Sequence, residues 1–367
     1  MGFSCGIVGL PNVGKSTLFN ALTRAGAASS NYPFCTIDPN IGVVPVPDKR
    51  LDELAKFVKP QRTVPTDIKF VDIAGIIKGA SKDGKGKGNQ FLANIREVDA
   101  ILQVIRLFDD ADIVHVHGKV DPLCDLDDII TELIIKDMES FEKRKSRIEK
   151  MALAGNKESK KELDFILKCL AILESGKMLF HNLEGEEHTL INELRPLTFK
   201  PMIIAANMDE VTVSNYQEND IYKKLKIKAD ELHAILVPFC AKLEVELQEL
   251  PDEEAKSLLH EYKLEEPGLN LIIREGYKIL NLITYFTAGE KEVRAWTIQK
   301  GTKAPQAASV IHTDFEKGFI KAEVVGYNDF IQAEGSFSKS KEMGKFRIEG
   351  KEYVFQDGDV VVFRFNV

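Results

Sequence analysis

The sequence has few cysteines, and their arrangement suggests neither disulfide nor metal chemistry. The five cysteines, at positions 5, 35, 124, 169 and 240, are odd in number and widely scattered over 367 residues. This spacing fits neither a disulfide framework nor a zinc site. We therefore expect a reducing, cytoplasmic compartment.

Long apolar runs and a secretory leader are also missing. No stretch approaches the roughly 18 consecutive apolar residues that a membrane-spanning helix needs. Residues 1–6 have neither the charged segment nor the apolar core of a signal peptide. We expect no membrane partner.

The sequence also lacks an excess of positive charge. Lys and Arg number 49 against 57 Asp and Glu, a net charge of −8, so an anionic partner must be met by a local patch. The chain is 44% hydrophobic and 29% charged, as folded soluble proteins are. At roughly 150 residues per domain, its length predicts two or three domains.

Apolar, β-branched runs alternate with helical or loop stretches over much of the chain, which predicts an α/β fold with a parallel sheet and crossover helices. The first run, residues 3–8, precedes a predicted helix at 15–24. The later runs are at 41–46, 68–73, 99–105, 201–206 and 235–239.

This alternation stops between about 127 and 195, where the sequence becomes helical and charged. Two apolar stripes at helical spacing flank a break at 154–156, and we expect an antiparallel helical hairpin. The stripes consist of Ile134, Met138, Phe141, Ile148 and Ala152, and of Leu163, Ile166, Leu167, Leu170 and Leu173.

The expected tip of this hairpin, residues 141–161, carries eight Lys or Arg and three Glu. Two interpretations stay open for this local charge of +5. It is either a solvated helical face or a basic knob that contacts RNA phosphates.

From about residue 281 the sequence indicates a small mixed β domain. Short alternating runs occur at 295–298, 319–324, 351–355 and 360–365, and the Asp357-Gly358 turn predicts that the last two form a hairpin. We therefore predict one domain over 1–126 and 196–280, a helical insertion over 127–195, and a C-terminal domain over 281–367.

A phosphate-binding loop follows the first strand. Residues 9–16, Gly-Leu-Pro-Asn-Val-Gly-Lys-Ser, match G-x-x-x-x-G-K-[ST] between a predicted strand and a predicted helix. The backbone N–H groups and the helix start would hold phosphates, and Lys15 would reach the β and γ phosphates. The candidate nucleotide contacts are Asn12, Val13, Gly14, Lys15, Ser16 and Thr17.

Two later positions suggest that this loop belongs to a γ-phosphate sensor. Thr36 lies in a loop twenty residues after Ser16, and Asp72 to Gly75 match D-x-x-G at the end of a strand. Ser16, Thr36 and Asp72 are the candidate Mg²⁺ ligands, and the Gly75 amide would face the γ-phosphate.

The base-recognition element departs from that of a GTPase. Asn207-Met208-Asp209-Glu210 follows a buried strand where a GTPase has N-K-x-D. Met208 replaces the lysine that packs on the base, and Glu210 replaces the aspartate that reads guanine. We expect ATP rather than GTP, with Asn207, Met208 and Glu210 shaping the pocket. Cys240-Ala241-Lys242 stands where the base-supporting loop would be.

In this order the motifs resemble those of the YchF, or Obg-like ATPase, family. The resemblance covers essentially the whole chain, including 31–36, 72–81, 207–210, 285–297 and 311–319. It implies a G domain with a coiled-coil insertion and a C-terminal TGS domain of β-grasp type. It also implies a preference for ATP, Mg²⁺ dependence and binding to the ribosome, with RNA as a further partner.

The residue that activates water is unusual. Ile76 stands where many switch NTPases have a glutamine, and it offers no hydrogen bond to water. The resemblance points to His115 for this role, with His117 as a competitor, so His115 and Lys15 are the catalytic candidates. Asn12 resembles the asparagine that some hydrophobic-substituted NTPases use to hold K⁺ beside the phosphates; ordering the loop is the alternative. Residues 78–88 would form a basic switch.

The resulting hypothesis is an ATP-hydrolysing switch that turns over slowly alone and acts on the ribosome. A GTPase of the same fold is one alternative. An RNA- or ribosome-binding adaptor that uses nucleotide as a passive sensor is another, favoured by Ile76. A monomer is the favoured oligomeric state.

Overall fold

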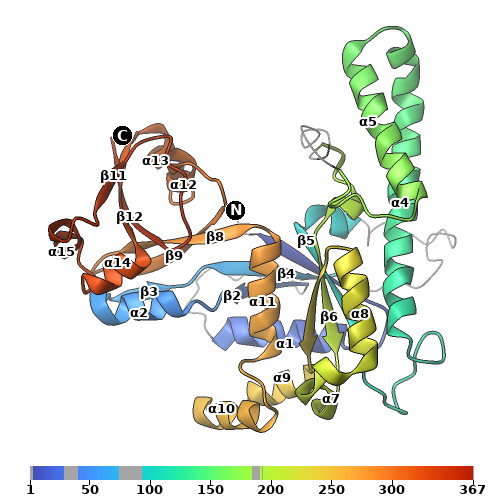
Figure 1. Ribbon diagram of the computed structural model, residues 1–367, viewed down its shortest axis with the longest axis horizontal. Coiled ribbons are helices and arrows are strands. Elements are labelled where there is room, and N and C mark those ends of the chain that lie inside the picture. The colour runs from blue at the N-terminus through green and yellow to red at the C-terminus, as the bar shows by residue number, and fades with distance from the viewer. Residues whose placement is uncertain (1–2, 29–39, 74–92, 184–190, 192, 367) are drawn as a thin grey trace.

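The computed structural model describes residues 3–28, 40–73, 93–183, 191 and 193–366. Its strands form two six-stranded sheets (Figure 1). The strands are β1 (Ser4–Val8), β2 (Ile41–Pro45), β3 (Arg62–Val64), β4 (Asp67–Asp72), β5 (Ala100–Arg106), β6 (Met202–Asn207), β7 (Ile235–Phe239), β8 (Leu282–Ala288), β9 (Glu292–Gln299), β10 (Phe319–Gly326), β11 (Arg347–Glu349) and β12 (Asp359–Phe365).

Helices cover both sheets. They are α1 (Lys15–Ala28), α2 (Lys49–Val58), α4 (Pro122–Leu153), α5 (Lys157–Glu174), α7 (Glu210–Ser214), α8 (Asp220–Glu231), α9 (Ala241–Leu247), α10 (Asp252–Glu261), α11 (Gly268–Ile279), α12 (Ala304–Ser309), α13 (Thr313–Lys317), α14 (Tyr327–Gln332) and α15 (Phe337–Glu342), with short 3-10 turns η1 (Leu197–Phe199) and η2 (Tyr216–Glu218).

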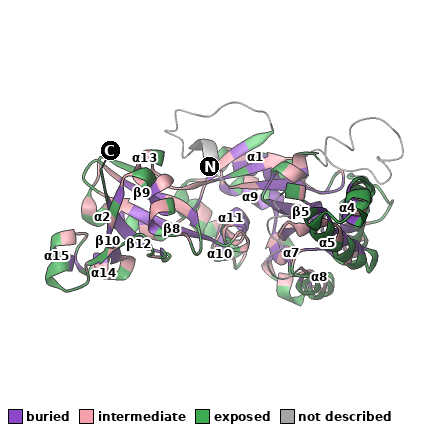
Figure 2. Ribbon diagram, turned by 90° about the horizontal axis from the view of Figure 1, so that it is seen from above, coloured by how far each residue is buried: buried purple, intermediate pink, exposed green. Residues whose placement is uncertain are grey.

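The first sheet has the order β2-β4-β1-β5-β6-β7 and is parallel except for the antiparallel edge strand β2. Its central strands are buried on both faces, which explains their nearly continuous apolar sequences. In Figure 2 the buried residues follow these strands, while the outward faces of α4 and α5 are exposed. The predicted α/β fold class is confirmed.

The helical hairpin projects from this domain (Figure 1). Asp121 caps the N-terminus of α4 and Asn156 that of α5. Helix α4 ends at Leu153 and α5 begins at Lys157, so the turn between them is short. The apolar stripe on α4 is confirmed, but Leu167 was wrongly placed on that of α5, since it is 45% exposed. Phe165 and Cys169 are buried instead, because the inward face runs through 165, 166, 169, 170 and 173.

The segment that leads from the hairpin back to the first sheet is hydrogen-bonded to the buried carboxylate of Asp137 on α4. Asp137 accepts hydrogen bonds from the backbone N–H groups of Leu197 (3.0 Å) and Thr198 (2.8 Å) and from the Thr198 hydroxyl (2.7 Å). Burial raises the pKa of Asp137, and these donors oppose that effect.

The second sheet, in the order β11-β10-β12-β8-β9-β3, takes its edge strand from the N-terminal half of the chain. β3 pairs in parallel with β9, and α2 buries Leu51 and Leu54 against one face of the sheet. Arg50 donates to Asp357 at 2.8 Å. Residues 49–64 therefore pack with the C-terminal sheet, although they belong to the predicted range 1–126; the domain boundaries stay a prediction.

Helix α11 makes the second connection between the sheets. It packs on the first sheet and leads directly into β8. The Tyr277 hydroxyl on α11 contacts the hydroxyls of Thr284 (2.9 Å) and Thr297 (2.8 Å) in the second sheet.

The predicted hairpin of 351–355 with 360–365 is wrong. Val354 makes only an isolated bridge, to Lys303, and β12 pairs with β10 and β8. The Asp359 carboxylate is buried and accepts from Gln356 N (2.9 Å) and the Tyr353 hydroxyl (2.7 Å). These bonds fix the turn before β12, and the backbone of Tyr353 and Phe355 bonds to Ala304 and Thr302 instead of to β12.

Candidate functional site

The P-loop lies between β1 and α1. Its residues Asn12 (φ 64°) and Gly14 (φ 95°) adopt left-handed backbone conformations, which allow the loop to turn sharply before the helix. Ser16 and Thr17 are exposed in the first turn of α1, whereas Val13 is buried. The helix N-terminus and two hydroxyls are therefore accessible to a phosphate group.

Lys15 and Asp72 form an ion pair at this point. Asp72 ends β4, and Ile7 of β1 is its partner in the parallel register, so the sheet brings the carboxylate to the P-loop. The structure thus brings together the phosphate-binding cation and one predicted Mg²⁺ ligand. Thr36, Gly75, Ile76 and the segment 78–88 lie outside the described residues.

Asn207, at the end of β6, joins the P-loop to the loop after β7. Its Nδ2 donates to the Val13 carbonyl at 2.9 Å, and its Oδ1 accepts from the Ala241 N–H at 3.0 Å. The side chain is buried, so both bonds are shielded from water. Asn207 therefore fixes the position of the base-recognition loops relative to the phosphate loop.

Met208 and Glu210 occupy different environments. Met208 is buried, and its N–H donates to the Phe239 carbonyl at 2.9 Å. Lys242 Nζ lies 2.9 Å from Glu210 Oε1 and lowers the pKa of this carboxyl. The carboxylate that would have to read a guanine base is thus already paired with a cation.

His115 faces away from solvent. Its Nε2 lies 3.0 Å from Asp125 Oδ2, and the His117 N–H donates to its Nδ1 at 3.3 Å. Since Nδ1 accepts, Nε2 carries the proton and donates to Asp125. His117 Nε2 lies 3.0 Å from Asp128 Oδ2. Both histidines are thus attached to the first turns of α4.

The loop carrying them is held by Arg106 and Asn12. The buried Arg106 guanidinium donates to the carbonyls of Phe108 (3.1 Å), Asp110 (3.1 Å) and Ile113 (2.9 Å). Asn12 Nδ2 donates to the Val114 carbonyl at 3.1 Å. Asn12 therefore orders this loop; a role in holding K⁺ stays a prediction.

Comparisons with known proteins agree over the full chain. A family model described as "50S ribosome-binding GTPase" matches residues 4–151, and YchF-GTPase_C, described as "Protein of unknown function (DUF933)", matches residues 282–366. Proteins named "Ribosome-binding ATPase YchF" from Haemophilus influenzae, Escherichia coli O157:H7 and Bacillus subtilis are 56%, 54% and 51% identical, with all of each chain covered. This chain belongs to the YchF family.

A solved YchF structure matches the fold as well. The "Structure of the Schizosaccharomyces pombe YchF GTPase" has a TM-score of 0.89 and 43% identity, and the match covers 99% of this chain and 98% of that one. The curated relatives are named ATPases, whereas the solved structure is named a GTPase. The contacts to the nucleotide base therefore bear on which triphosphate this YchF-family chain prefers.

Three contacts of this YchF-family site were missed by sequence reasoning: the Arg106 bonds, the Asp125–His115 bond and the Lys242–Glu210 pair. A charged residue that closes an apolar strand, such as Arg106, is a detectable signal. The other two join residues whose proximity depends on the fold. In the described part of the chain, no cluster of three or more His, Cys, Asp or Glu could hold a metal ion.

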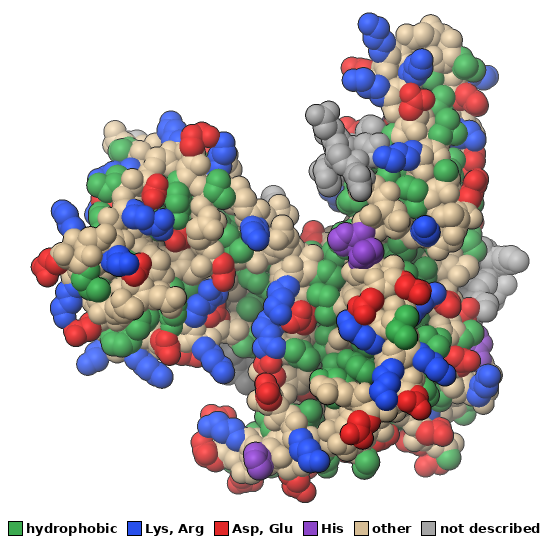
Figure 3. Space-filling model, in the orientation of Figure 1, with side chains coloured by type: hydrophobic (Ala, Val, Ile, Leu, Met, Phe, Trp, Pro, Cys, Tyr) green, Lys and Arg blue, Asp and Glu red, His purple; other side chains and the backbone are tan. Residues whose placement is uncertain are grey.

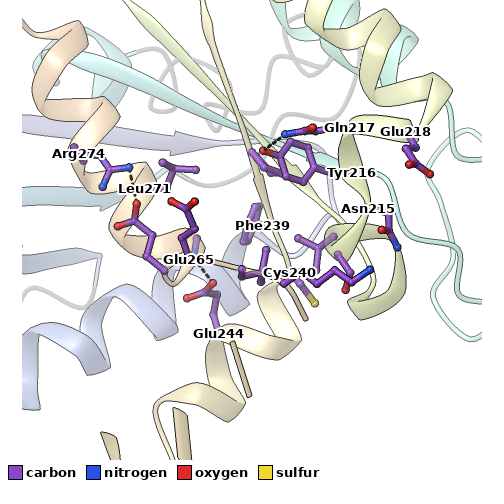
Figure 4. Close-up of a pocket in the computed structure, with 17 residues that line it drawn as sticks. Asn215, Tyr216, Gln217, Glu218, Phe239, Cys240, Glu244, Glu265, Leu271 and Arg274 are labelled. Atoms are coloured by element: carbon purple, nitrogen blue, oxygen red, sulfur yellow. Dashed lines mark hydrogen bonds and ion pairs between the residues drawn. The ribbon is translucent and has the colours of Figure 1, made fainter. Parts of the chain in front are cut away.

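A cavity of about 450 Å³ lies beside the base-recognition loops, and Cys240 of the loop after β7 lines it (Figure 4). Tyr216 and Gln217 border one side, and Leu271 and Arg274 of α11 border the other. Glu244 accepts a hydrogen bond from Gly268 N at 2.6 Å and caps α11. None of the P-loop residues, Asn207, Met208 or Glu210 lines this cavity, so it is not the predicted base pocket.

Proposed function

We propose that this chain is a ribosome-binding ATPase that works as a nucleotide-dependent switch. The observation that carries the proposal is the junction at Asn207, which ties the phosphate loop to a base loop that lacks a free guanine-reading carboxylate. The relatives that match this chain over their whole length are named ribosome-binding ATPases. The reaction is hydrolysis of ATP: water attacks the γ-phosphorus, and the bond to the bridging oxygen of ADP breaks.

The phosphates bind at the P-loop. The backbone N–H groups of residues 12–17 and the start of α1 offer donors, and Lys15 moves from Asp72 to the β and γ phosphates. Exchange of one anion for another keeps the Lys15 ammonium paired, which lowers the cost of phosphate binding. The Gly75 amide is proposed to face the γ-phosphate.

Mg²⁺ fits the donors at this position. The exposed Ser16 hydroxyl and the Asp72 carboxylate are hard oxygen ligands, and a site with few protein ligands suits an ion that also binds phosphate oxygens and waters. Ser16, Asp72 and Thr36 would hold the ion, which supplies neutralisation of phosphate charge.

The base is selected by the segment after β6. Met208 presents no ammonium to the base, and the Glu210 carboxylate is paired with Lys242. Guanine needs a free carboxylate for its N1–H and amine, whereas adenine has no such pair of donors. ATP is therefore favoured over GTP.

The hairpin is the proposed ribosome contact. At its tip, Arg144 pairs with Glu162 and Lys145 with Glu142, whereas six other basic residues are exposed. Figure 3 shows basic side chains on the surface of the tip. These six are Lys143, Arg147, Lys150, Lys157, Lys160 and Lys161. An exposed cluster of this kind suits ribosomal RNA phosphates. None of the helices in the described part combines the length and apolar character needed to cross a bilayer. We place the protein in the cytoplasm, where ribosomes are.

Steady-state hydrolysis of ATP and GTP, with and without ribosomes, tests this function. We expect ATP to be the better substrate and ribosomes to raise its turnover, and we expect His115→Ala to lower it. A GTPase would show the reverse base preference. An adaptor would show no ribosome stimulation and no change in His115→Ala.

A further inference from the structure

In the segment 113–117, apolar side chains are exposed to solvent while the His115 side chain is buried. Val114 is 74% exposed and Val116 is also exposed, whereas the His115 side chain between them is only 3% exposed. Apolar side chains gain free energy by leaving water, and a buried imidazole needs compensating hydrogen bonds. This arrangement persists because specific bonds hold His115 inside.

Asp125 supplies the strongest of these bonds. Its Oδ2 accepts from His115 Nε2 at 3.0 Å, while its Oδ1 is buried and has no hydrogen-bond partner among the described residues. Burial raises the pKa of Asp125, and the bond to His115 opposes this rise. A buried acceptor without a hydrogen-bond partner carries a desolvation cost, which lowers the net stability of the buried arrangement.

Both nitrogens of His115 are occupied in this arrangement, so the ring has no free atom for a water molecule. Yet the neighbouring Val114 carbonyl accepts from Asn12 of the P-loop at 3.1 Å. This contact places the segment 114–115 next to the P-loop. A rotation of the backbone that exchanges the two side chains would turn His115 toward the phosphate site and Val114 inward.

We propose that Asp125 is a positioning residue that holds His115 away from the phosphate site, and that its release controls ATP hydrolysis. The inference rests on the proposed function, because it requires His115 to act on the attacking water. The observed rate of ATP hydrolysis is then the hydrolysis rate of molecules in which His115 has left Asp125, multiplied by the fraction of such molecules.

The position of Asp125 links this control to the hairpin. Asp125 lies in the first turns of α4, which continues without interruption to the basic tip at residues 141–153. Asp128 of the same helix holds His117. A partner that moves α4 from its tip therefore acts directly on the bond that retains His115.

The test measures ribosome-free ATP turnover and the KM for ATP in Asp125→Ala and Asp125→Asn. We expect kcat to rise about tenfold in Asp125→Ala, because a charge-assisted bond is lost, with little change in KM. Asp125→Asn retains a weaker acceptor and should lie between Asp125→Ala and wild type. Ribosomes should stimulate Asp125→Ala less than wild type. A fall in kcat would overturn the proposal, since it would mean that Asp125 supports the active state.

Two further variants separate this role from a structural one. Asp128→Ala breaks the neighbouring histidine bond on the same helix, and its ribosome-free kcat should stay near wild type; activation by Asp128→Ala instead of Asp125→Ala would assign the role to His117. Asp125→Ala combined with His115→Ala should be as slow as His115→Ala. If His115→Ala alone has wild-type turnover, the proposed function of His115 fails, whatever Asp125→Ala does.

Hydrogen exchange at the His115 C2 position, measured by mass spectrometry, gives a readout independent of turnover. Exchange should be slow in wild type and in Asp128→Ala, and several-fold faster in Asp125→Ala. Equal exchange in all three proteins would contradict release of the ring. A thermal melt of each variant checks that the fold is retained.

Discussion

The side chain of Asn207 lies directly over Gly14. A Cβ atom on Gly14 would come within 2.2 Å of Asn207 Nδ2, the atom that donates to the Val13 carbonyl. The backbone of the P-loop and the first residue of the base-recognition segment are thus in contact without room for a methyl group. We therefore predict that phosphate binding and base recognition are coupled through this contact.

Gly14→Ala should therefore abolish ATP binding, because the methyl group displaces Asn207 and the residue must keep a φ of 95°. Gly155→Ala is the matched control: its φ is 91°, and nothing lies within 4 Å of its added Cβ. It carries the backbone strain alone and should bind ATP as wild type does. Equilibrium dialysis with labelled ATP measures both.

Asn207→Ala removes two buried hydrogen bonds and leaves the Val13 carbonyl and the Ala241 N–H without partners. We expect a loss of about 1–3 kcal/mol in the free energy of unfolding and at least about tenfold weaker ATP binding. Asn219→Ala, which removes the cap of α8, should cost about 1 kcal/mol without changing ATP affinity. Equal ATP affinities for the two variants would contradict the role of Asn207.

Met208→Lys combined with Glu210→Asp should shift the ratio of ATP to GTP affinity toward GTP by about tenfold or more, since it restores the lysine and shortens the carboxylate. Because Met208 is buried, the new ammonium should also lower the unfolding free energy by several kcal/mol, and thermal melts would detect this. Glu210→Asp alone should shift the ratio less. An unchanged ratio in the double variant would place base selection elsewhere.

Glu244 predicts a pH dependence of stability. Burial raises its pKa from 4.5 to about 7, although Gly268 and Leu269 donate hydrogen bonds to it. Between these two values the folded chain keeps a proton that the unfolded chain has lost. The free energy of unfolding therefore falls as pH rises through this window, by at most about 3 kcal/mol from this group.

Glu244→Gln removes that titration. The difference in unfolding free energy between wild type and this variant should shift in favour of the variant from pH 4.5 to 7.5, as measured by urea denaturation at each pH. A difference that stays constant across this range would show that Glu244 titrates normally.

Leu54 on α2 should stabilise the second sheet, although it precedes strands β8 and β9 of that sheet by more than two hundred residues. Leu54→Ala should cost about 2–5 kcal/mol and speed amide hydrogen exchange in β8 and β9. Leu22→Ala removes an equally buried leucine from α1, which packs on β2 and β4, and should speed exchange in those strands instead. The same exchange pattern in both variants would contradict this assignment of α2.

Much of the first domain could be predicted from sequence because its central strands β1, β5 and β6 are runs of apolar residues buried on both faces. All six runs from residue 3 to residue 239 became strands within a residue or two. The short strand β3 could not be predicted, since three residues acquire strand geometry only by pairing with distant β9. The residues 351–355 alternate like a strand, but the backbone of Tyr353 and Phe355 bonds to Ala304 and Thr302 rather than to β12.

The candidate site divides in the same way. The P-loop, Asp72 and Asn207 follow from local motifs at strand ends, and the sheet brings them together. The pairings of His115 with Asp125 and of Glu210 with Lys242 depend on how separate elements pack, so no spacing in the sequence predicts them. The roles of these residues in binding and hydrolysis stay predictions.

Isothermal titration calorimetry of the full chain with Mg²⁺ and ATP, and then with GTP in competition, tests the central claim most directly. We predict saturable binding of one ATP per chain and weaker displacement by GTP. Absence of any adenine or guanine nucleotide binding, or tighter binding of GTP, would contradict the proposed ATP-dependent switch.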